Sequence, residues 1–418
     1  MERMALPAGG DAGRRFVPRR QRAGWRAGGR DAGSWGRAPG LPVRVRTLSR
    51  RGAPVSQPRL VQFRLTFQVL TPLHIGSGIR YHRDYDFRDE GGKAVRLVDV
   101  DRALELLPDQ LIPRIADGRI AAALDPRTLE QATRAILPVY GTRAVGQDLL
   151  AFIRDGMGRA YLPGSTLKGA FRSALLDAFV QRNRDTVRGL VRAGEGSREQ
   201  AARGVERRAF DVNIEHTVEG RDFPNRDVNR WLRLADAFPV GELKMVASEV
   251  QVRSVSSRGR QAIPVWVEAV SPGAQFVTTL AMAPAAWSPW KELDDDRKVL
   301  FGSNLLGVLQ TWGAALREIE LAHWRRLDPG VASNFEGKVP AGQTVFPVGF
   351  GTGWVAKTIG RHLRDDRDLM RQLLYRYRLS RSKSPDPANF PVGHRVVDGP
   401  GGWLPMGWVM VSGAEPVR

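Results

Sequence analysis

Cysteine is absent from this 418-residue chain, and histidine is scarce, with six copies. Without thiols the chain can form neither disulfides nor thiolate metal sites, which fits a reducing compartment such as the cytoplasm. The histidines show no HExxH-type pairing, so we expect no dedicated zinc site and no cofactor. No apolar run approaches 18 residues, no lipidation motif is present, and the arginine-rich start lacks the apolar segment of a secretory signal. The sequence therefore predicts no membrane attachment.

Acidic residues are also few relative to basic ones. The 44 Asp and Glu stand against 64 Lys and Arg, which gives a net charge of +20 and a pI near 11.1. This balance predicts a polyanionic partner, with nucleic acid the first candidate. Residues 1–60 hold 14 arginines, no lysine and three acids, a net charge of +11, so the remainder still carries +9. We predict a disordered basic tail over residues 1–59, either an RNA-binding arm or a translated extension without a role.

The first regular pattern is an alternation of apolar and polar residues over 63–69, which predicts a half-buried strand. It runs into TPLHIGSG, residues 71–78, where Gly76, Ser77 and Gly78 would let another backbone approach closely. Phosphates and stacked bases suit the cations and aromatics that follow, although a hairpin loop without a ligand would look the same. Those residues are Arg80, Tyr81, His82, Arg83 and Tyr85.

A second motif, YLPGSTLKGAFR, occupies residues 161–172. Its Pro-Gly turn precedes an amphipathic helix, and Ser165 or Thr166 is placed to cap the first turn. Lys168 opposes the positive end of the helix dipole unless an anion joins it. Unbonded N–H groups, small residues and two cations, Lys168 and Arg172, therefore indicate a phosphate site, with a solvated lysine on an ordinary strand–helix unit as the alternative.

A glycine cluster lies in residues 345–354, VFPVGFGTGW, where three alternate residues lack a side chain. This strip would allow another backbone to approach, and the polar residues after it could hold phosphates. The residues concerned are Gly349, Gly351, Gly353, Lys357, Thr358 and Arg361. Residues 351–358 are one residue from the P-loop pattern GxxxxGK[ST], but Ala356 stands where glycine is required, so nucleotide binding is a minor alternative.

The remaining pattern completes a mixed α and β chain. We predict strands at 94–98, 243–252, 265–270, 275–281 and in the closing LPMGWV, residues 404–409, and a strand followed by a turn over 231–238. We predict a helix from 294 to 326, a short helix ending at 107 and capped by Asp99 or Asp101, a charged helical hairpin or loop at 181–230, and mixed helix and loop over 108–150.

Four motifs occur in order: strand–TPLHIGSG, strand–YLPGSTLKGAFR, the strand-borne LRLADAF and the late loop GFGTGWVAKT. Together they resemble the RAMP superfamily of CRISPR-associated proteins over about residues 60–412. Within it, the chain looks most like the RAMP subunit that caps the backbone filament of type III-A (Csm) effector complexes, and LPMGWV fits too. There are two departures. The family's basic Phe-Pro-Lys-type segment reads FPVGHR here, which leaves His394 and Arg395 for that role, and the tail has no counterpart.

The resemblance implies an α+β fold of two RRM-like (ferredoxin-like) modules. These span 60–240, with a charged helical insertion near 181–230, and 241–418, with the glycine-rich loop at 349–353. It also implies a non-catalytic subunit that binds crRNA near its 3′ end and acts in crRNA maturation and assembly. The implied partners are the repeated backbone RAMP subunit and the small subunit of the Csm complex. Target RNA and host nucleases are additional implied partners.

Carried over onto this chain, the RNA-binding positions are His74, Gly76, Ser77, Gly78, Gly164, Ser165, Lys168, Gly169, Arg172, Gly349, Gly351, Gly353, Lys357 and Thr358. To these the residue pattern adds Arg80, His82, Arg83 and Arg361, with bases stacking on Tyr81, Tyr85 or Trp354.

A rival hypothesis is an endoribonuclease, because some RAMP proteins cleave RNA with a loop aspartate and a metal or with a histidine base. Asp84, Asp86 or His74 could take those roles here, and Asp236 is a further acid in LRLADAF.

Overall fold

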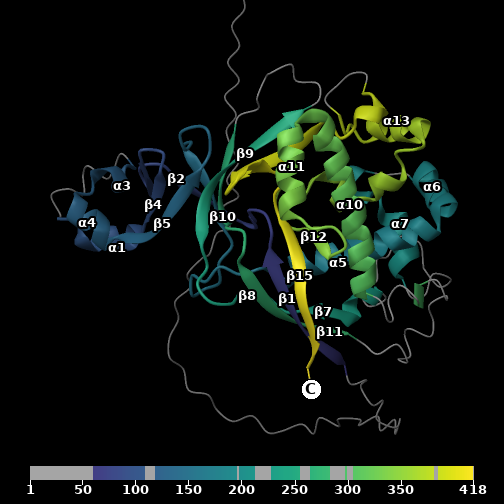
Figure 1. The fold of residues 1–418 in the computed structure, drawn as a ribbon, viewed down its shortest axis with the longest axis horizontal. Helices are drawn as coiled ribbons and strands as arrows, with labels where there is room; N and C mark the ends of the chain where they lie inside the picture. The colour runs from purple at the N-terminus through teal and green to yellow at the C-terminus, as the bar shows by residue number, and fades with distance from the viewer. Residues whose placement is uncertain are drawn as a thin grey trace, which may run out of the picture. The chain divides into compact units, whose positions relative to one another are not determined.

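The computed structural model describes residues 60–108, 118–194, 197–211, 227–254, 264–282, 297–298, 305–380 and 385–417. These residues belong to one compact unit, Gln57–Arg418, and form an α+β fold with two sheets (Figure 1). The α+β class predicted from the sequence is confirmed. The predicted tail, residues 1–59, lies outside the described residues.

The first sheet is built around the first strand, with the order β12-β15-β1-β11-β7 and β8 also paired with β11. Strand β1 (Val61–Val69) runs antiparallel to β11 (Gln275–Met282) on one side and to β15 (Trp408–Pro416) on the other (Figure 1). The shorter strands are β12 (Val345–Pro347), β7 (Leu232–Leu234) and β8 (Phe238–Pro239).

The second sheet has the order β2-β6-β10-β9-β5-β4-β3, and β13 and β14 extend it from β9. Its strands are β2 (Gly76–His82), β3 (Phe87–Glu90), β4 (Ala94–Val98), β5 (Thr133–Tyr140), β6 (Asp148–Phe152), β9 (Met245–Ser254), β10 (Val265–Val270), β13 (Gly393–Gly399) and β14 (Gly402–Leu404). Both sheets contain strands from either side of residue 240. The module boundary predicted there does not follow the sheets and stays a prediction.

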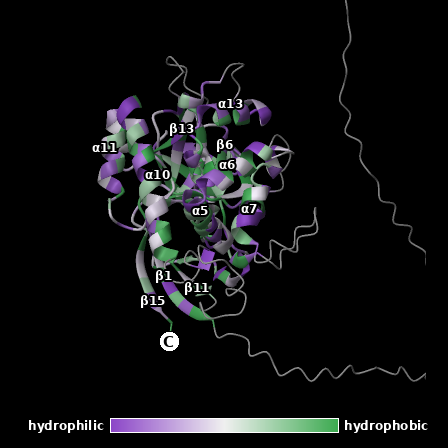
Figure 2. Cartoon of the chain, turned by 90° about the vertical axis from the view of Figure 1, so that its right-hand side faces the viewer, coloured by the Kyte–Doolittle hydropathy of each residue, from purple (hydrophilic) through white to green (hydrophobic). Residues whose placement is uncertain are grey.

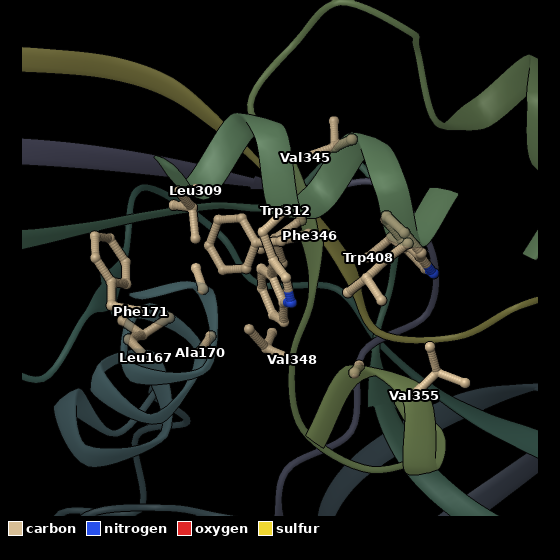
Figure 3. Close-up of a cluster of buried hydrophobic side chains, with 14 of the residues drawn as sticks. Leu167, Ala170, Phe171, Leu309, Trp312, Val345, Phe346, Val348, Val355 and Trp408 are labelled. Carbon is tan, nitrogen blue, oxygen red and sulfur yellow. The ribbon is translucent and has the colours of Figure 1, made fainter. Parts of the chain in front are cut away.

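Helices α5 (Gly164–Arg182) and α10 (Leu305–Leu327) share a core with the first sheet. Phe346 of β12 lies at its centre. The Phe346 ring meets Phe67 of β1 edge-on at 6.1 Å between centroids and Phe171 of α5 at 6.2 Å. Figure 3 shows Phe171 approaching this ring from α5 while Leu309 and Trp312 approach it from α10. Burial of these large side chains fixes the distance between α5 and the strand that precedes the glycine-rich loop.

Shorter helices surround this core. They are α1 (Val100–Leu106), α3 (Ile120–Ala123), α4 (Pro126–Gln131), α6 (Arg184–Ala193), α7 (Arg203–Phe210), α11 (Pro329–Lys338), α12 (Gly353–Lys357) and α13 (Arg367–Arg376). Helices α1, α3 and α4 enclose a small separate core. Figure 2 shows much hydrophilic colour on α11 and α13, as expected for helices with one face in water.

Most element predictions hold, but two were wrong. The predicted closing strand 404–409 is the end of β14, a turn at 405–407 and the start of β15. Strands β4 and β10 have the predicted bounds, and the Asp99 carboxylate caps α1 by accepting from the Arg102 N–H at 3.0 Å. The predicted long helix is α10, although 283–296 and 299–304 lie outside the described residues. The second wrong prediction is 108–150, predicted as mixed helix and loop, which contains α3 and α4 but also β5 and the start of β6. Strand β6 lies between two other strands and is nearly all apolar, so it carries no alternation to read.

Backbone bonds hold the glycine-rich loop after β12 against the turn after β1 and against the segment before β15. The Phe350 N–H donates to the His74 carbonyl at 2.8 Å, and the Val348 N–H donates to the Gly407 carbonyl at 2.8 Å. Gly349 has a left-handed φ of +77°, and a Cβ there would lie 2.4 Å from the His74 carbonyl oxygen. Gly349 is therefore required by the close approach of two protein backbones.

Replacement of Gly349 by alanine tests this docking, and Gly353 provides a matched control. Gly353 has nearly the same φ, +76°, but nothing lies within 4 Å of a Cβ placed there. We expect Gly353→Ala to lower the free energy of unfolding by about 1 kcal/mol from backbone strain alone. Gly349→Ala should lose about 1–3 kcal/mol more because of the clash. Urea unfolding measures both, and equal losses would contradict the docking.

Candidate nucleic-acid interface

Three of the segments singled out in the sequence meet at one groove of about 490 Å³. The turn after β1 contributes Ile75 and Gly76, and the glycine-rich loop contributes Gly349, Phe350 and Lys357. One face of α5 forms the facing wall, with Thr166, Gly169, Ala170 and Ser173. Four of the eighteen predicted RNA-binding residues therefore line the groove: Gly76, Gly169, Gly349 and Lys357.

The residues that α5 contributes to the groove wall have small side chains. Gly169, Ala170 and Ser173 follow Thr166 by three, four and seven residues, so the four positions share one face of the helix. Gly169 is exposed, and nothing lies within 4 Å of a Cβ placed on it. Glycine inside a helix costs about 1 kcal/mol relative to alanine. Since packing does not require glycine at this position, its effect is to keep the groove open.

The start of α5 is capped differently from the prediction. Its N-cap is Pro163, and no side chain of the first turn caps it, so capping by Ser165 or Thr166 was wrong. Instead the Gly164 N–H donates to Oδ1 of Asp236 at 2.7 Å. A Cβ on Gly164 would lie 2.3 Å from the carbonyl oxygen of Leu234, so the LRLADAF strand presses directly on the helix start. The carboxylate of Asp236 thus supports a helix dipole.

Two of the predicted phosphate-binding cations are paired with acids. Arg172 donates to Asp227 at 2.6 Å and to Glu206 at 3.1 Å. Arg361 forms a two-pronged ion pair with the buried Asp177, which also accepts from His362 at 2.8 Å. Burial raises the pKa of Asp177, but the bonds from Arg361 and His362 outweigh it and hold that pKa below its usual range. These pairs tie α5 to its neighbours, and a role for Arg172 and Arg361 in RNA binding stays a prediction.

Lys168 lies on another side of α5 from the groove. It does not line the groove and shares its surroundings with Asp227, Arg172 and Arg233. Burial lowers the pKa of Lys168, and the two arginines lower it further against the opposing effect of Asp227. Lys168 and Arg172 lie one turn apart on the same flank of α5, as the sequence predicted, but Lys168 does not line the groove with Gly169 and Lys357.

Lys357 and Arg395 are two neighbouring cations without an acid. Neither forms an ion pair with any residue in the described ranges, and both are exposed. The Arg395 guanidinium lies over the ring of Phe350, 5.0 Å from its centroid, at the groove wall. Although Lys357 as a whole residue is exposed, partial burial of its charged end lowers its pKa, and the charge of Arg395 lowers it further. An anion bound here would relieve that repulsion.

Arg395 is the residue that sequence reasoning passed over. It was named as a remnant of the family's basic segment but not chosen as a site residue. Its partner in that remnant, His394, is buried, lies 3.4 Å from Glu320 and stacks on His323 with ring centroids 3.6 Å apart. Because successive residues of a strand face opposite sides, a buried His394 places Arg395 on the outer face of β13. That alternation was the available signal.

The other residues of the glycine-rich loop have local roles. Gly351 has a φ of +88°, and a Cβ there would lie 2.4 Å from the Met406 side chain. Gly351 and Gly353 line a smaller pocket of about 40 Å³, which Arg395 also lines. The Thr358 hydroxyl accepts from the Gly360 N–H at 3.1 Å and so caps the next turn.

The residues after the first glycine loop lie on β2 and its turn, and do not line the groove. Strand β2 advances four residues, from Gly76 to Arg80, against two on β6, which is a bulge. Arg80 and His82 share Asp148 at 3.4 and 2.9 Å, in exposed pairs that leave both side chains accessible. The remaining members serve the loop itself: Ser77 donates to the Ala151 carbonyl, Gly78 adopts a φ of +87°, and Arg83 donates to Val145 and Asp89.

The residues proposed for RNA cleavage are held in structural contacts. His74 is buried, and its Nδ1–H donates to the Glu268 carbonyl at 2.7 Å. Burial lowers the pKa of His74 to about 4, against the opposing effect of that hydrogen bond. Asp84 pairs with Arg119, and Asp86 accepts from the His82 N–H. In the described part of the chain no three His, Cys, Asp or Glu side chains are placed to hold a metal ion.

The residues proposed for nucleotide binding and for base stacking also have structural roles in the fold. Residues 353–357 are already helical as α12, so the segment is not an open loop ending at Lys357 as a P-loop would be. Tyr81 is buried beneath the Arg134 guanidinium, and Tyr85 packs against the small core of α1, α3 and α4. The Trp354 ring contacts Phe390 edge-on at 4.8 Å.

None of the helices in the described ranges is long and apolar enough to cross a bilayer. The family model of the RAMP superfamily matches residues 66–281, slightly more than half of the chain. The chain therefore belongs to the RAMP superfamily, as its motifs predicted.

Comparison with individual proteins shows which named proteins the chain is similar to. The chain is 25% identical over 334 residues to the CRISPR system Cms protein Csm5 of Mycobacterium tuberculosis (strain H37Rv), covering 72% of this chain and 83% of that protein. It is 22% identical over 231 residues to the protein of the same name in Streptococcus thermophilus, covering 50% and 61%.

Solved structures share the fold. A chain of a cryo-EM structure of a Csm–crRNA–target RNA ternary complex from a type III-A CRISPR–Cas system matches with a TM-score of 0.60 at 23% identity, covering 84% of this chain and 100% of that one. The crystal structure of T. onnurineus Csm5 matches with a TM-score of 0.58 at 23% identity, covering 83% and 100%.

Protonation of His74 should make stability depend on pH. Its folded pKa of about 4 lies below the ordinary 6.5, so between these values the unfolded chain binds a proton that the folded chain does not. The contribution of neutral His74 is complete above pH 6.5 and falls by up to about 1.4 kcal/mol per pH unit below it. His74→Asn can keep a donor to the Glu268 carbonyl but cannot titrate. We expect urea unfolding of the wild type to lose stability more steeply than that of the variant, and parallel curves would contradict the assignment.

Proposed function

We propose that this chain is a non-catalytic, crRNA-binding subunit of a type III-A (Csm) effector complex. In this proposal it caps the backbone filament near the crRNA 3′ end, takes part in crRNA maturation and assembly, and meets the repeated backbone subunit and the small subunit. Its two RRM-like modules would span 60–240 and 241–418. Target RNA and host nucleases are further proposed partners.

The observation that carries the RNA-binding proposal is the groove with its two unpaired cations. Lys357 lines it, and Arg395 flanks it over the Phe350 ring. Phosphate contacts from lysine and arginine supply affinity that does not depend on sequence, as a subunit that accepts any guide requires. Gly169 and Gly76 line the groove without bulky side chains, so a ribose-phosphate chain could lie close to the protein backbone.

The comparisons support the assembly part of the proposal. The Csm–crRNA–target RNA complex contains a chain of similar fold, and the match covers all of that chain. The curated relatives carry the name of a Csm protein.

Charge reversal at Lys357 tests the phosphate contact. We expect Lys357→Glu to weaken binding of labelled single-stranded RNA at least about tenfold, whatever its sequence, because a charge-assisted bond is lost and repulsion added. The slope of log affinity against log salt concentration should become shallower by about 0.7 for each lost contact. Fluorescence anisotropy over a salt series measures both.

Lys93→Glu is the matched control, since it makes the same charge change in the exposed turn between β3 and β4, away from the groove. If both variants lose affinity equally, binding follows net charge alone and the groove is not the site.

Filling the groove from α5 tests its occupancy without altering charge. Gly169→Trp would project an indole into the groove, and we expect it to weaken RNA binding at least about tenfold, in line with the loss of one charge-assisted contact. Stability should be unchanged or slightly higher, because glycine is a poor residue inside a helix. Gly189→Trp on α6, where a Cβ also meets open space, is the control for a new exposed tryptophan. Wild-type affinity in the Gly169 variant would place the RNA elsewhere.

A further inference from the structure

The groove wall on α5 carries two hydroxyl groups that no protein group uses. Thr166 and Ser173 both line the groove, and neither side chain forms a hydrogen bond with any residue of the described ranges. Elsewhere in this protein a helical threonine bonds back to the preceding turn: the Thr311 hydroxyl donates to the Gly307 carbonyl at 2.9 Å. On the opposite wall the Thr352 hydroxyl is engaged with the Gly349 carbonyl at 3.3 Å. The unused hydroxyl groups of the groove are therefore confined to α5.

Their positions suit a strand that runs along the helix. Seven residues separate Thr166 from Ser173, about 10.5 Å along the axis, so they can contact different riboses. Gly169 and Ala170 lie between them and present almost no side chain. Lys357 and these α5 residues line the same groove, so a strand whose phosphates meet Lys357 can place its sugars against the α5 wall. A hydroxyl group both donates and accepts a hydrogen bond, and so matches the ribose 2′-OH, the group that distinguishes RNA from DNA.

We propose that Thr166 and Ser173 recognise ribose 2′-hydroxyls and give this groove its preference for RNA over single-stranded DNA. The proposal rests on RNA lying in the groove and adds a specificity that phosphate contacts cannot supply, because Lys357 and Arg395 meet the same phosphates in both polymers.

The test compares oligonucleotides of one sequence made of RNA and of DNA, bound to the full chain. Thr166→Val keeps the shape of the side chain and removes its hydroxyl, and Ser173→Ala removes the other. We expect each variant to lower RNA affinity about threefold to tenfold, the range for one neutral hydrogen bond, and to leave DNA affinity unchanged. The two sites are far enough apart to act independently, so the double variant should lose the product of the two factors.

Two further variants separate recognition from damage. Thr166→Ser retains the hydroxyl and should restore the RNA preference, whereas Thr186→Val, the same change as Thr166→Val on the exposed face of α6, should have no effect. The proposal is overturned if the wild type binds both polymers equally, or if the α5 variants weaken both by the same factor. The Lys357→Glu variant tests RNA binding separately. If Lys357→Glu weakens RNA binding while the ratio of RNA to DNA affinity is the same with and without the two hydroxyl groups, only the 2′-OH proposal fails.

Discussion

The groove depends on one backbone contact, the bond from the Phe350 N–H to the His74 carbonyl. His74 follows β1 of the first sheet, and its ring donates to the Glu268 carbonyl of β10 in the second sheet. The residue that receives the glycine-rich loop therefore also joins the two sheets. Because the loop can approach only where position 349 has no Cβ, Gly349 brings Phe350 and Lys357 opposite α5.

Helix α5 forms the opposite wall and is held at both ends by segments distant in sequence. Asp236 accepts from its first N–H, and its Asp177 carboxylate receives Arg361 and His362 from just beyond the glycine-rich loop. Between them Phe171 packs on Phe346. A wall fixed in this way keeps its small residues at constant spacing, which lowers the entropy lost when a flexible strand binds. Asp236 and Arg361, two of the polar residues that look functional in the sequence, make contacts that hold α5 in place.

Local pattern predicted much of this architecture, because runs of apolar residues mark strands such as β4 and β10, apolar periodicity marks the helix α5, and Asp99 marks the start of α1. It failed where tertiary context decides. Strand β6 reads as a plain apolar run, and the cap of α5 comes from Asp236, some seventy residues away. At the site, small-residue turns flanked by cations correctly marked three segments that share a groove. Which cations remain without an acid depends on neighbours brought together only by folding, so Arg172 could not be told from Lys357.

The division of the cations then bears on function more directly than the net charge of +20 does. Arginines that meet carboxylates stabilise the fold, and their charge is already compensated within the protein. Lys357 and Arg395 are different, because neither meets a carboxylate among the described residues. Burial lowers the pKa of Lys357, and the nearby charge of Arg395 lowers it further. Folding alone gains nothing from placing two like charges side by side against a half-enclosed groove. An anion bound beside the two cations would offset their repulsion, and the phosphates of an RNA backbone, as proposed above, are anions of this kind.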